Sequence, residues 1–288
     1  MLNRRHFLAT LGSTIGGGVM YNSFATTLPK LGTLAPRRLE RIGIQLYTVR
    51  RVLPGDFEGT LAKLGAMGYR EVEFAGYFNH SAADVKAILT KAGLTSPSTH
   101  MDFVGLRKDP APQVDFAAAV GHEFVTVAWV DESLRKTKAD WLKIADDFNR
   151  IGAAVKARGM RFAYHNHDME FKPVDGEMPL DLLMAHTDPS LVNFQLDLYW
   201  ITEGGQSPFD YIKRYPTRFV MFHMKDSAGP PKHEQVDVGS GKIDFSSILR
   251  LDAEQKHVVK HVFVEHDDPA DPMAFAKNSV DYLKKLEY

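Results

Sequence analysis

Residues 138–167 read KADWLKIADDFNRIGAAVKARGMRFAYHNH and contain one complete structural unit. Apolar residues recur every three or four positions over 138–157, which predicts an amphipathic helix. Gly159 follows at the point where such a helix ends, because glycine readily adopts the backbone conformation that closes a helix. The run 160–165 is then short and apolar, which is typical of a buried strand. The stretch therefore predicts a helix, a tight turn and a strand.

The same alternation of strand and helix repeats from Arg41 to the end of the chain. Other amphipathic stretches lie at 56–66, 81–91 and 271–286, and Gly68, Gly93 and Gly121 also stand just before predicted strands. The expected strands are 41–46, 70–75, 94–99, 123–128, 160–165, 191–197, 218–223 and 259–265. Eight such units in one chain of 288 residues predict an α/β fold with a single (β/α)8 TIM barrel over 41–288.

The main competing fold is an open, doubly wound sheet. That fold usually carries a glycine-rich phosphate-binding turn after its first strand. Here the corresponding segment, 45–50, reads QLYTVR and contains no glycine. The closed barrel is therefore favoured.

The first residues have the pattern of an export signal. Arg4 and Arg5 precede a weakly apolar stretch rich in Gly and Ser, and Ser-Phe-Ala at 23–25 resembles a cleavage site. Residues 1–25 thus resemble a twin-arginine signal peptide, which predicts export to the periplasm by the twin-arginine machinery; the alternative is a disordered basic tail. The apolar run is too short to span a membrane, so no integral span is expected after processing. Residues 26–40 are interpreted as a linker.

Composition excludes several classes of function. The chain has 35 Lys+Arg and 36 Asp+Glu, and a formal net charge of -1 gives no electrostatic reason to expect nucleic-acid binding. The absence of Cys excludes a disulfide scaffold, a Cys-ligated zinc site and a thiol nucleophile.

Polar side chains stand where the predicted strands end, and a barrel of this kind builds its active site at those ends. Burying acids and imidazoles together is costly without compensation. A divalent cation is the most economical explanation, because Zn²⁺, Mn²⁺, Co²⁺ and Fe²⁺ accept both kinds of ligand. The residues are Gln45, Glu73, His100, Trp129, His165, His167, Asp197, His223, Lys225, Glu265 and His266.

Six segments in this order resemble the xylose isomerase-like superfamily, the sugar phosphate isomerase/epimerase group of TIM barrels. They are GIQLY (43–47), GYREVE (68–73), YHNHD (164–168), QLDLYW (195–200), FHMKD (222–226) and VGSGKIDF (238–245). The resemblance covers residues 41–287 and implies a barrel that acts on a carbohydrate and often forms a homodimer. No single segment identifies one reaction.

The resemblance also implies one divalent metal ion, of the Mn, Co, Zn or Fe class, at the ends of strands five to eight. Asp197, His223 and Glu265 match the family ligands on strands six, seven and eight. Strand five departs from the pattern, because His165 stands where many members have Glu. Glu170, in the following loop, could supply an oxygen instead, so the fourth ligand is expected to be either His165 or Glu170.

This departure bears on the chemistry. Family epimerases use two carboxylates on opposite faces of the substrate, and the loss of one favours abstraction by a single base of a proton next to a carbonyl. The metal would stabilise the resulting enediolate. Candidate catalytic residues are His100, His167, Lys225 and Glu265. For Lys225 the structural alternative is an ion pair with Glu265 or Asp226. Candidate substrate contacts are Gln45, Tyr47, Glu73, Trp129 and Trp200, and Phe103 is a further candidate for an apolar wall.

The expected function is therefore a metal-dependent isomerase, epimerase, lyase or hydratase acting on a sugar or keto-sugar, with a 3-keto-glycoside among the candidates. One alternative is a non-catalytic, exported sugar-binding barrel. Another is a DNA-repair enzyme of the endonuclease IV type, against which the net charge argues.

Two loops and the other histidines complete the expectations. The turn 238–241 could cradle a phosphate or simply lead into the next helix, and the segment 230–233 could form a lid. His266 is expected at most to support a ligand. The histidines expected on the surface or in loops are His80, His122, His186, His233, His257 and His261.

Overall fold

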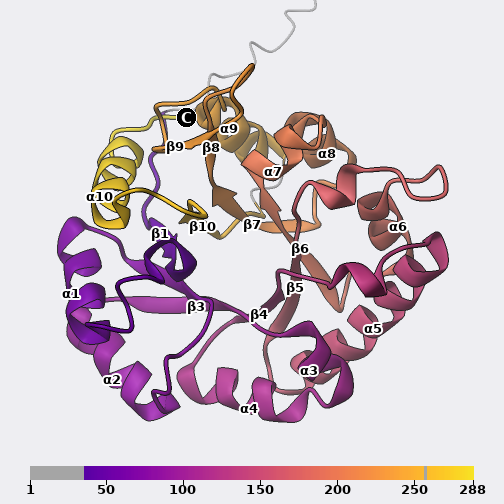
Figure 1. The fold of residues 1–288 in the computed structure, drawn as a ribbon, viewed down its shortest axis with the longest axis horizontal. Coiled ribbons are helices and arrows are strands. Elements are labelled where there is room, and N and C mark those ends of the chain that lie inside the picture. The colour runs from indigo at the N-terminus through magenta and orange to yellow at the C-terminus, as the bar shows by residue number, and fades with distance from the viewer. Residues whose placement is uncertain (1–35, 256–257) are drawn as a thin grey trace, which may run out of the picture. The chain divides into compact units, whose positions relative to one another are not determined.

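All eight runs expected as strands form strands, and they close into one parallel barrel (Figure 1). The computed structural model describes residues 36–255 and 258–288. The barrel strands are β1 (Gly43–Gln45), β2 (Glu71–Phe74), β3 (Thr95–His100), β4 (Phe124–Val127), β5 (Arg161–His165), β6 (Val192–Asp197), β7 (Phe219–Met224) and β10 (His261–Val264). Around the barrel the strands β2 to β7 pair in sequence order, and β7 pairs with β10. The barrel closes through β1, which lies between β10 and β2. The predicted TIM barrel is confirmed.

Helices form the outer ring of the barrel in Figure 1. They are α1 (Phe57–Met67), α2 (Ala82–Ala92), α3 (Phe103–Lys108), α4 (Ala111–Val120), α5 (Lys138–Ala157), α6 (Pro179–His186), α7 (Leu198–Glu203), α8 (Pro208–Arg214), α9 (Phe245–Gln255) and α10 (Pro272–Leu283), with 3₁₀ turns η1 (Leu46–Val49), η2 (Glu132–Leu134) and η3 (Met169–Phe171). Reciprocal side-chain caps start α2 and α5, at Ser81 and Thr137. Gly68, Gly93 and Gly121 end their helices with positive φ, as predicted.

The barrel closes at a position that only glycine fits. Gly43 of β1 pairs with Glu71 on one side and Phe263 on the other. A Cβ atom at Gly43 would lie 2.5 Å from the Phe263 ring. Any larger residue there would therefore push the closing strands apart.

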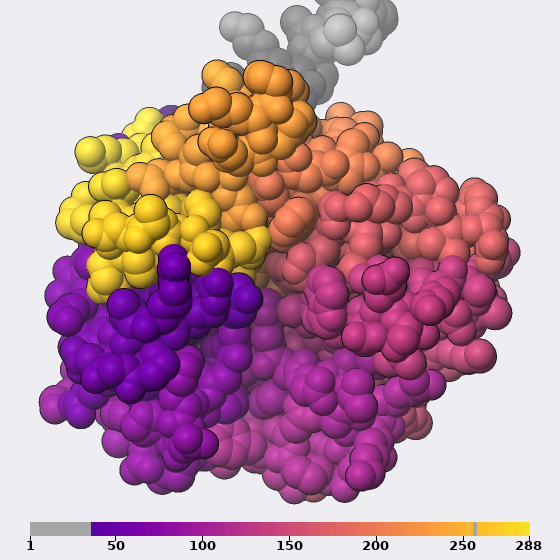
Figure 2. All heavy atoms as spheres, in the orientation of Figure 1, coloured from indigo at the N-terminus to yellow at the C-terminus, as the bar shows by residue number. Residues whose placement is uncertain are grey.

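The inside of the barrel is built in layers. Phe124, Ala163, Met221 and Phe263 are fully buried and form an apolar layer. Residues two positions further along a strand point to the same side, so His165 and His223, which follow Ala163 and Met221, project next to this layer, nearer the carboxyl ends of the strands. The mouth of the barrel thus rests on a packed support, and the same view in space-filling form is hollowed near the middle of the ring (Figure 2).

Two segments add to the barrel. Residues β8 (Asp226–Ser227) and β9 (Gln235–Val236) form a two-stranded antiparallel hairpin after β7, which the sequence did not predict. The compact unit begins at Pro36, because Arg37 exchanges two backbone hydrogen bonds with Tyr288. The last residues of the expected linker are therefore attached to the barrel.

The expected signal segment, 1–25, lies outside the described residues, as does 26–35 of the expected linker. Among the described helices, none is both long enough and apolar enough to cross a membrane.

Candidate metal centre and active site

Four of the predicted site residues meet at the mouth of the barrel. His165, Asp197, His223 and Glu265 stand at the ends of β5, β6, β7 and β10, and all four are buried. One potential ligand atom from each lies within 4.8 Å of the others. Because metal–nitrogen and metal–oxygen bonds of about 2 Å hold ligand atoms at most about 4 Å apart, slight side-chain adjustment would let one ion contact all four.

Asp197 presents one oxygen to this cluster. Its Oδ1 caps α7 by accepting hydrogen bonds from the backbone N–H groups of Tyr199 and Trp200, at 2.9 and 2.8 Å. Its Oδ2 accepts no hydrogen bond from any described residue, and it lies 3.9 Å from His165 Nε2 and 4.0 Å from His223 Nδ1. Complete burial raises the pKa of Asp197 to about 6. A buried carboxylate oxygen that accepts no hydrogen bond is suited to a cation, and the Lys225 ammonium lies 3.3 Å from it.

His223 lies between two carboxylates. Its Nδ1 is 2.9 Å from Glu265 Oε2, and its Nε2 is 2.6 Å from Glu73 Oε2. Burial disfavours the charged imidazolium, but Glu265 and Glu73 outweigh it and raise the pKa of His223 to about 10. A carboxylate on the far nitrogen of a ligating histidine orients the ring and strengthens it as a ligand, and Glu73 is placed to serve His223 in this way if a metal ion binds at Nδ1.

The donor set fits a divalent ion. Two imidazole nitrogens and two carboxylate oxygens are accepted by Zn²⁺, Mn²⁺, Co²⁺ and Fe²⁺. Of the two residues expected to compete for the fourth position, the structure places His165 in the cluster.

Glu170 lies elsewhere. Its Oε1 accepts a hydrogen bond from the Tyr164 hydroxyl, and its Oε2 accepts one from the backbone N–H of His167 at 2.7 Å. Burial raises the pKa of Glu170 to about 7. Glu170 therefore supports the loop that carries His167, and we correct the expectation that it folds back to the metal.

Lys225 is fully buried beside the cluster. Its Nζ lies 2.8 Å from Glu265 Oε2, 2.8 Å from Asp267 Oδ1 and 3.3 Å from Asp197 Oδ2. Burial opposes its charge, but these three carboxylates raise the pKa of Lys225 above its usual value. Asp267 was missed in the sequence, although it stands two residues after Glu265 and so faces the same way when the backbone stays extended.

His167, Trp129 and Trp200 form one wall of the mouth. The His167 ring lies 5.4 Å from the Trp129 ring and 5.5 Å from the Trp200 ring, centroid to centroid. Desolvation, assisted by the positive charge of Lys225, lowers the pKa of His167 to about 4. Trp129 is 54% exposed, and Tyr47, at 41%, lies beneath the Arg50 guanidinium. These exposed rings remain available to a substrate.

Gln45, Glu73 and His100 have a different role from the one expected. Gln45 and Glu73 are completely buried, and Gln45 Nε2 donates to Glu73 Oε2 at 2.8 Å. His100 Nε2 lies 3.1 Å from the same oxygen, and its Nδ1 is 3.3 Å from Gln45 Nε2. Because their polar atoms are used by one another, we reassign Gln45 and Glu73 from substrate contact, and His100 from proton transfer, to support of the site. Phe103 is also buried and packs on Phe148.

The glycine turn at 238–241 has no free donors for a phosphate. The buried Asp226 carboxylate accepts hydrogen bonds from the backbone N–H groups of Gly239, Gly241 and Ile243, at 2.8, 3.0 and 3.2 Å. The turn is therefore structural, and this network also explains why Lys225 does not pair with Asp226.

The segment expected as a lid is tied to the mouth. Gln235 accepts a hydrogen bond from the backbone N–H of Asp267 at 2.8 Å and donates to its carboxylate. The Tyr199 hydroxyl donates to the backbone oxygen of His233 at 2.8 Å. His266 Nε2 lies 3.2 Å from the backbone oxygen of Gln235. His266 thus supports the hairpin rather than a metal ligand.

Two of the histidines expected on the surface or in loops are enclosed by the barrel. His122 lies in the loop between α4 and β4, but it is buried, where Nδ1 donates to the Ser96 backbone oxygen at 2.8 Å and Nε2 lies 2.8 Å from the Tyr77 hydroxyl. His261 begins β10 instead of lying in a loop, 2.8 Å from Glu71. His80 is half-buried, His186 and His233 are exposed, and His257 lies outside the described residues.

Several known proteins resemble this chain in sequence and in fold. An inosose dehydratase from Clostridium botulinum is 23% identical over 270 residues, covering 80% of this chain and 89% of the relative. A sugar phosphate isomerase/epimerase structure from Parabacteroides distasonis is 26% identical, with a TM-score of 0.75, over 85% of this chain and 98% of that one. A D-psicose 3-epimerase from Clostridium cellulolyticum, at 15% identity and a TM-score of 0.67 over 85% and 99%, shares the fold.

These names support a sugar-modifying enzyme, as the sequence predicted. The model of the family described as "Xylose isomerase-like TIM barrel" matches residues 61–286. The chain therefore belongs to the xylose isomerase-like TIM barrel family.

Proposed function

We propose that this protein is a divalent-metal-dependent enzyme that removes a proton next to the carbonyl of a keto-sugar or a keto-cyclitol. Loss of a hydroxide as water is the favoured outcome, and isomerisation or hydration are its close alternatives. The observation that carries the proposal is the cluster of His165, Asp197, His223 and Glu265, in which Asp197 Oδ2 is buried and accepts no hydrogen bond from the described residues. The inosose dehydratases among its relatives support dehydration.

The residues of the mouth suit such a reaction. A metal ion held by the four-residue cluster would supply the Lewis acidity that polarises the substrate carbonyl. Lys225, fixed by three carboxylates, would donate a hydrogen bond to the oxygen on which negative charge develops. His167 is the candidate base, because its low pKa keeps it neutral near pH 7 and its Nδ1 has no hydrogen-bond partner among the described residues. The protonated ring could then return the proton to the departing hydroxyl.

The substitution of His for a carboxylate on strand five limits the reaction. In this cluster His165 is completely desolvated, and burial lowers its pKa well below the usual value. A neutral ligand at this corner cannot act as the second carboxylate of a two-base epimerisation. The proposal therefore favours chemistry on one face of the substrate.

The test is metal content combined with proton exchange. Wild-type protein purified without chelator should hold about one transition metal ion per chain, and it should incorporate solvent deuterium next to the carbonyl of an inosose or a 3-keto-glycoside. Asp197→Asn should lose both the metal and the exchange. Asn193→Leu, which removes a buried amide from the same strand but from the far end of the barrel, should keep both. Wild-type protein that binds no metal and exchanges no proton would contradict the proposal.

From the sequence of 1–25 we also propose export to the periplasm by the twin-arginine route, and from the family resemblance a homodimer. Cell fractionation of an Arg4→Lys/Arg5→Lys variant tests the first, since the protein should then stay in the cytoplasm. Light scattering tests the second, and a monomer mass would exclude the dimer.

A further inference from the structure

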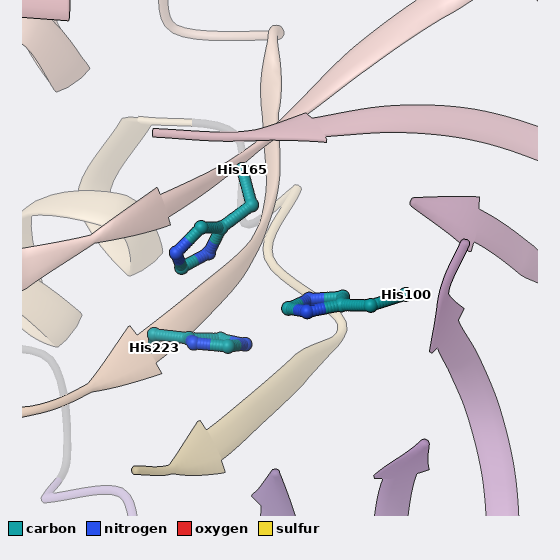
Figure 3. A group of neighbouring side chains, drawn as sticks. All are labelled: His100, His165 and His223. Atoms are coloured by element: carbon teal, nitrogen blue, oxygen red, sulfur yellow. The ribbon is translucent and has the colours of Figure 1, made fainter. Parts of the chain in front are cut away.

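Three imidazoles point toward one another at the mouth of the barrel, and two of them belong to the candidate metal centre (Figure 3). They belong to His100, His165 and His223, on three different strands, and a nitrogen of each lies within 4.8 Å of the others. Such a trio is itself a possible metal site. The hydrogen bonds around the rings indicate a different role.

The ring nitrogens are directed at two oxygens. Gln195 Oε1 lies 3.1 Å from His165 Nδ1 and 3.0 Å from His100 Nε2. Glu73 Oε2 lies 3.1 Å from His100 Nε2 and 2.6 Å from His223 Nε2. Amide and carboxylate oxygens only accept hydrogen bonds, so each of these three nitrogens carries its hydrogen.

The orientation of the Gln195 amide is itself determined. Its Nε2 donates to Glu73 Oε1 at 2.8 Å, and Ser98 Oγ donates to the same oxygen at 2.6 Å. A carboxylate cannot donate to an amide oxygen, so the NH₂ group must face Glu73 and the carbonyl oxygen must face the imidazoles. Gln195 is completely buried, which keeps water from offering an alternative partner.

This arrangement decides which nitrogen of His165 can bind a metal. With its hydrogen on Nδ1, a neutral ring has its lone pair on Nε2. His165 Nε2 is the atom that faces Asp197 Oδ2, at 3.9 Å. In the opposite tautomer the lone pair would point down at Gln195, away from the carboxylates.

We propose that Gln195 is a positioning residue, which holds His165 and His100 in one tautomer each and so leaves His165 Nε2 free to ligate the metal. This inference rests on the proposed metal centre. It assigns no second metal to the three imidazoles, because one nitrogen of each ring, His100 Nε2, His165 Nδ1 and His223 Nε2, is already directed at Glu73 or Gln195. Gln195 touches neither substrate nor metal and acts only through the rings.

The decisive measurement is the tautomeric state of the histidines in metal-free protein, read from ¹⁵N chemical shifts of histidine-labelled samples. In the wild type, His165 should be protonated on Nδ1 and His100 on Nε2, with each signal assigned by its loss in His165→Gln or His100→Gln. Gln195→Met keeps the size of the side chain but removes the acceptor, so both rings should lose these fixed tautomers. Gln195→Glu keeps an oxygen facing the rings, and a proton held between its second oxygen and Glu73 Oε1 would replace the lost amide donor, so this variant should restore them.

Asn193→Leu is the matched control, because Asn193 is a buried amide of the same strand with hydrogen bonds to Arg161 and Phe162 but none to an imidazole. It should leave the tautomers unchanged. Unchanged tautomers in Gln195→Met, or equal changes in Asn193→Leu, would overturn the assignment.

Metal affinity provides a second readout in the same variants. Gln195→Met should bind Mn²⁺ or Co²⁺ about 10- to 100-fold more weakly than the wild type, the usual effect of losing an outer partner of a ligating histidine. Gln195→Glu should be closer to the wild type. Two equivalents of metal in the wild type would refute the assignment of the three imidazoles. If the wild type binds no metal, the proposed function fails, while the tautomers still decide the role of Gln195.

Discussion

The barrel contains the same pair of residues twice, once at each end. At the mouth, Glu73 of β2 lies 2.6 Å from His223 of β7. At the opposite end, Glu71, two residues earlier on β2, lies 2.8 Å from His261 of β10. Both glutamates are buried and both pairs face inward. Only the pair at the mouth belongs to a candidate active site.

The neighbours of each pair make the difference. At the lower end every acid has a cation nearby: Arg41 is 3.6 Å from Glu71, and Lys260 is 3.3 Å from Glu123, which in turn is 3.6 Å from His261. At the mouth, Asp197 and Glu265 join Lys225 and two imidazoles, and one ligand atom from each of His165, Asp197, His223 and Glu265 lies within 4.8 Å of the others. Each end has a buried carboxylate oxygen that accepts no hydrogen bond from the described residues, Glu71 Oε1 or Asp197 Oδ2, so the convergence of ligand atoms is what distinguishes the mouth.

The presence of a cavity does not mark the candidate site. A cavity of about 660 Å³ lies at the lower end, where Glu71, His261 and Arg41 are among the residues that line it. Yet both groups of side chains that could hold a metal ion, among the residues described, are at the mouth. In a barrel of this type the lower end is expected to serve stability rather than catalysis.

The strongest test of the functional difference between the two ends is to replace the histidine at each end. His223→Asn should abolish metal binding and reduce kcat/KM by more than about 100-fold, because even an outer partner of a metal ligand costs 10- to 100-fold. His261→Asn should leave both close to the wild type and lower only the thermal stability. Equal losses of activity in the two variants would show that the ends of the barrel are not functionally distinct.

The sequence predicted most of this mouth because parallel strands all end on the same side. Eight predicted runs, six of which have an acid or an imidazole within two residues of their end, were enough to bring His165, Asp197, His223 and Glu265 together. It could not predict which atoms would be used internally: Glu73 and Gln45 also end strands, but they face the layer below the mouth and bond to one another.

Glu170 and Gln195 show the two opposite errors. Glu170 has the right chemistry at the right distance along the chain, but the neighbouring Tyr164 hydroxyl takes its carboxylate. Gln195 carries no charge and stands inside a strand, so its polarity looked incidental. Its position two residues before Asp197, on the same face of β6, was the signal that could have identified it.

A lysine at each end provides the next comparison. Lys225→Met should destabilise metal-free protein by about 3–5 kcal/mol, because it leaves the buried carboxylates without their cation. Added Mn²⁺ should recover part of this loss by binding only the folded state. Lys260→Met removes a half-exposed partner of Glu123, and such pairs contribute roughly 0–1 kcal/mol. Chemical denaturation measures the free energy of unfolding of both variants, each with and without metal. A small effect of Lys225→Met would mean that the charge of Lys225 does not hold the acids together.

The last comparison concerns a buried imidazole that has no carboxylate partner, and its effect appears only at low pH. Whereas Glu265 and Glu73 raise the pKa of His223 to about 10, desolvation lowers that of His122 to about 4. The unfolded chain, with an ordinary histidine pKa of about 6.5, therefore binds the proton more tightly than the folded protein does between these values. Stability attributable to His122 should be complete above pH 6.5 and should fall by about 3 kcal/mol as the pH drops to 4.

His122→Gln tests this effect, since its amide can still donate to the Ser96 oxygen and accept from Tyr77. Its free energy of unfolding should fall less steeply than that of the wild type between pH 6.5 and 4, with the two curves parallel above pH 7. Parallel curves throughout would mean that water reaches His122. The difference in pKa between His122 and His223 would then be due to Glu265 and Glu73 alone.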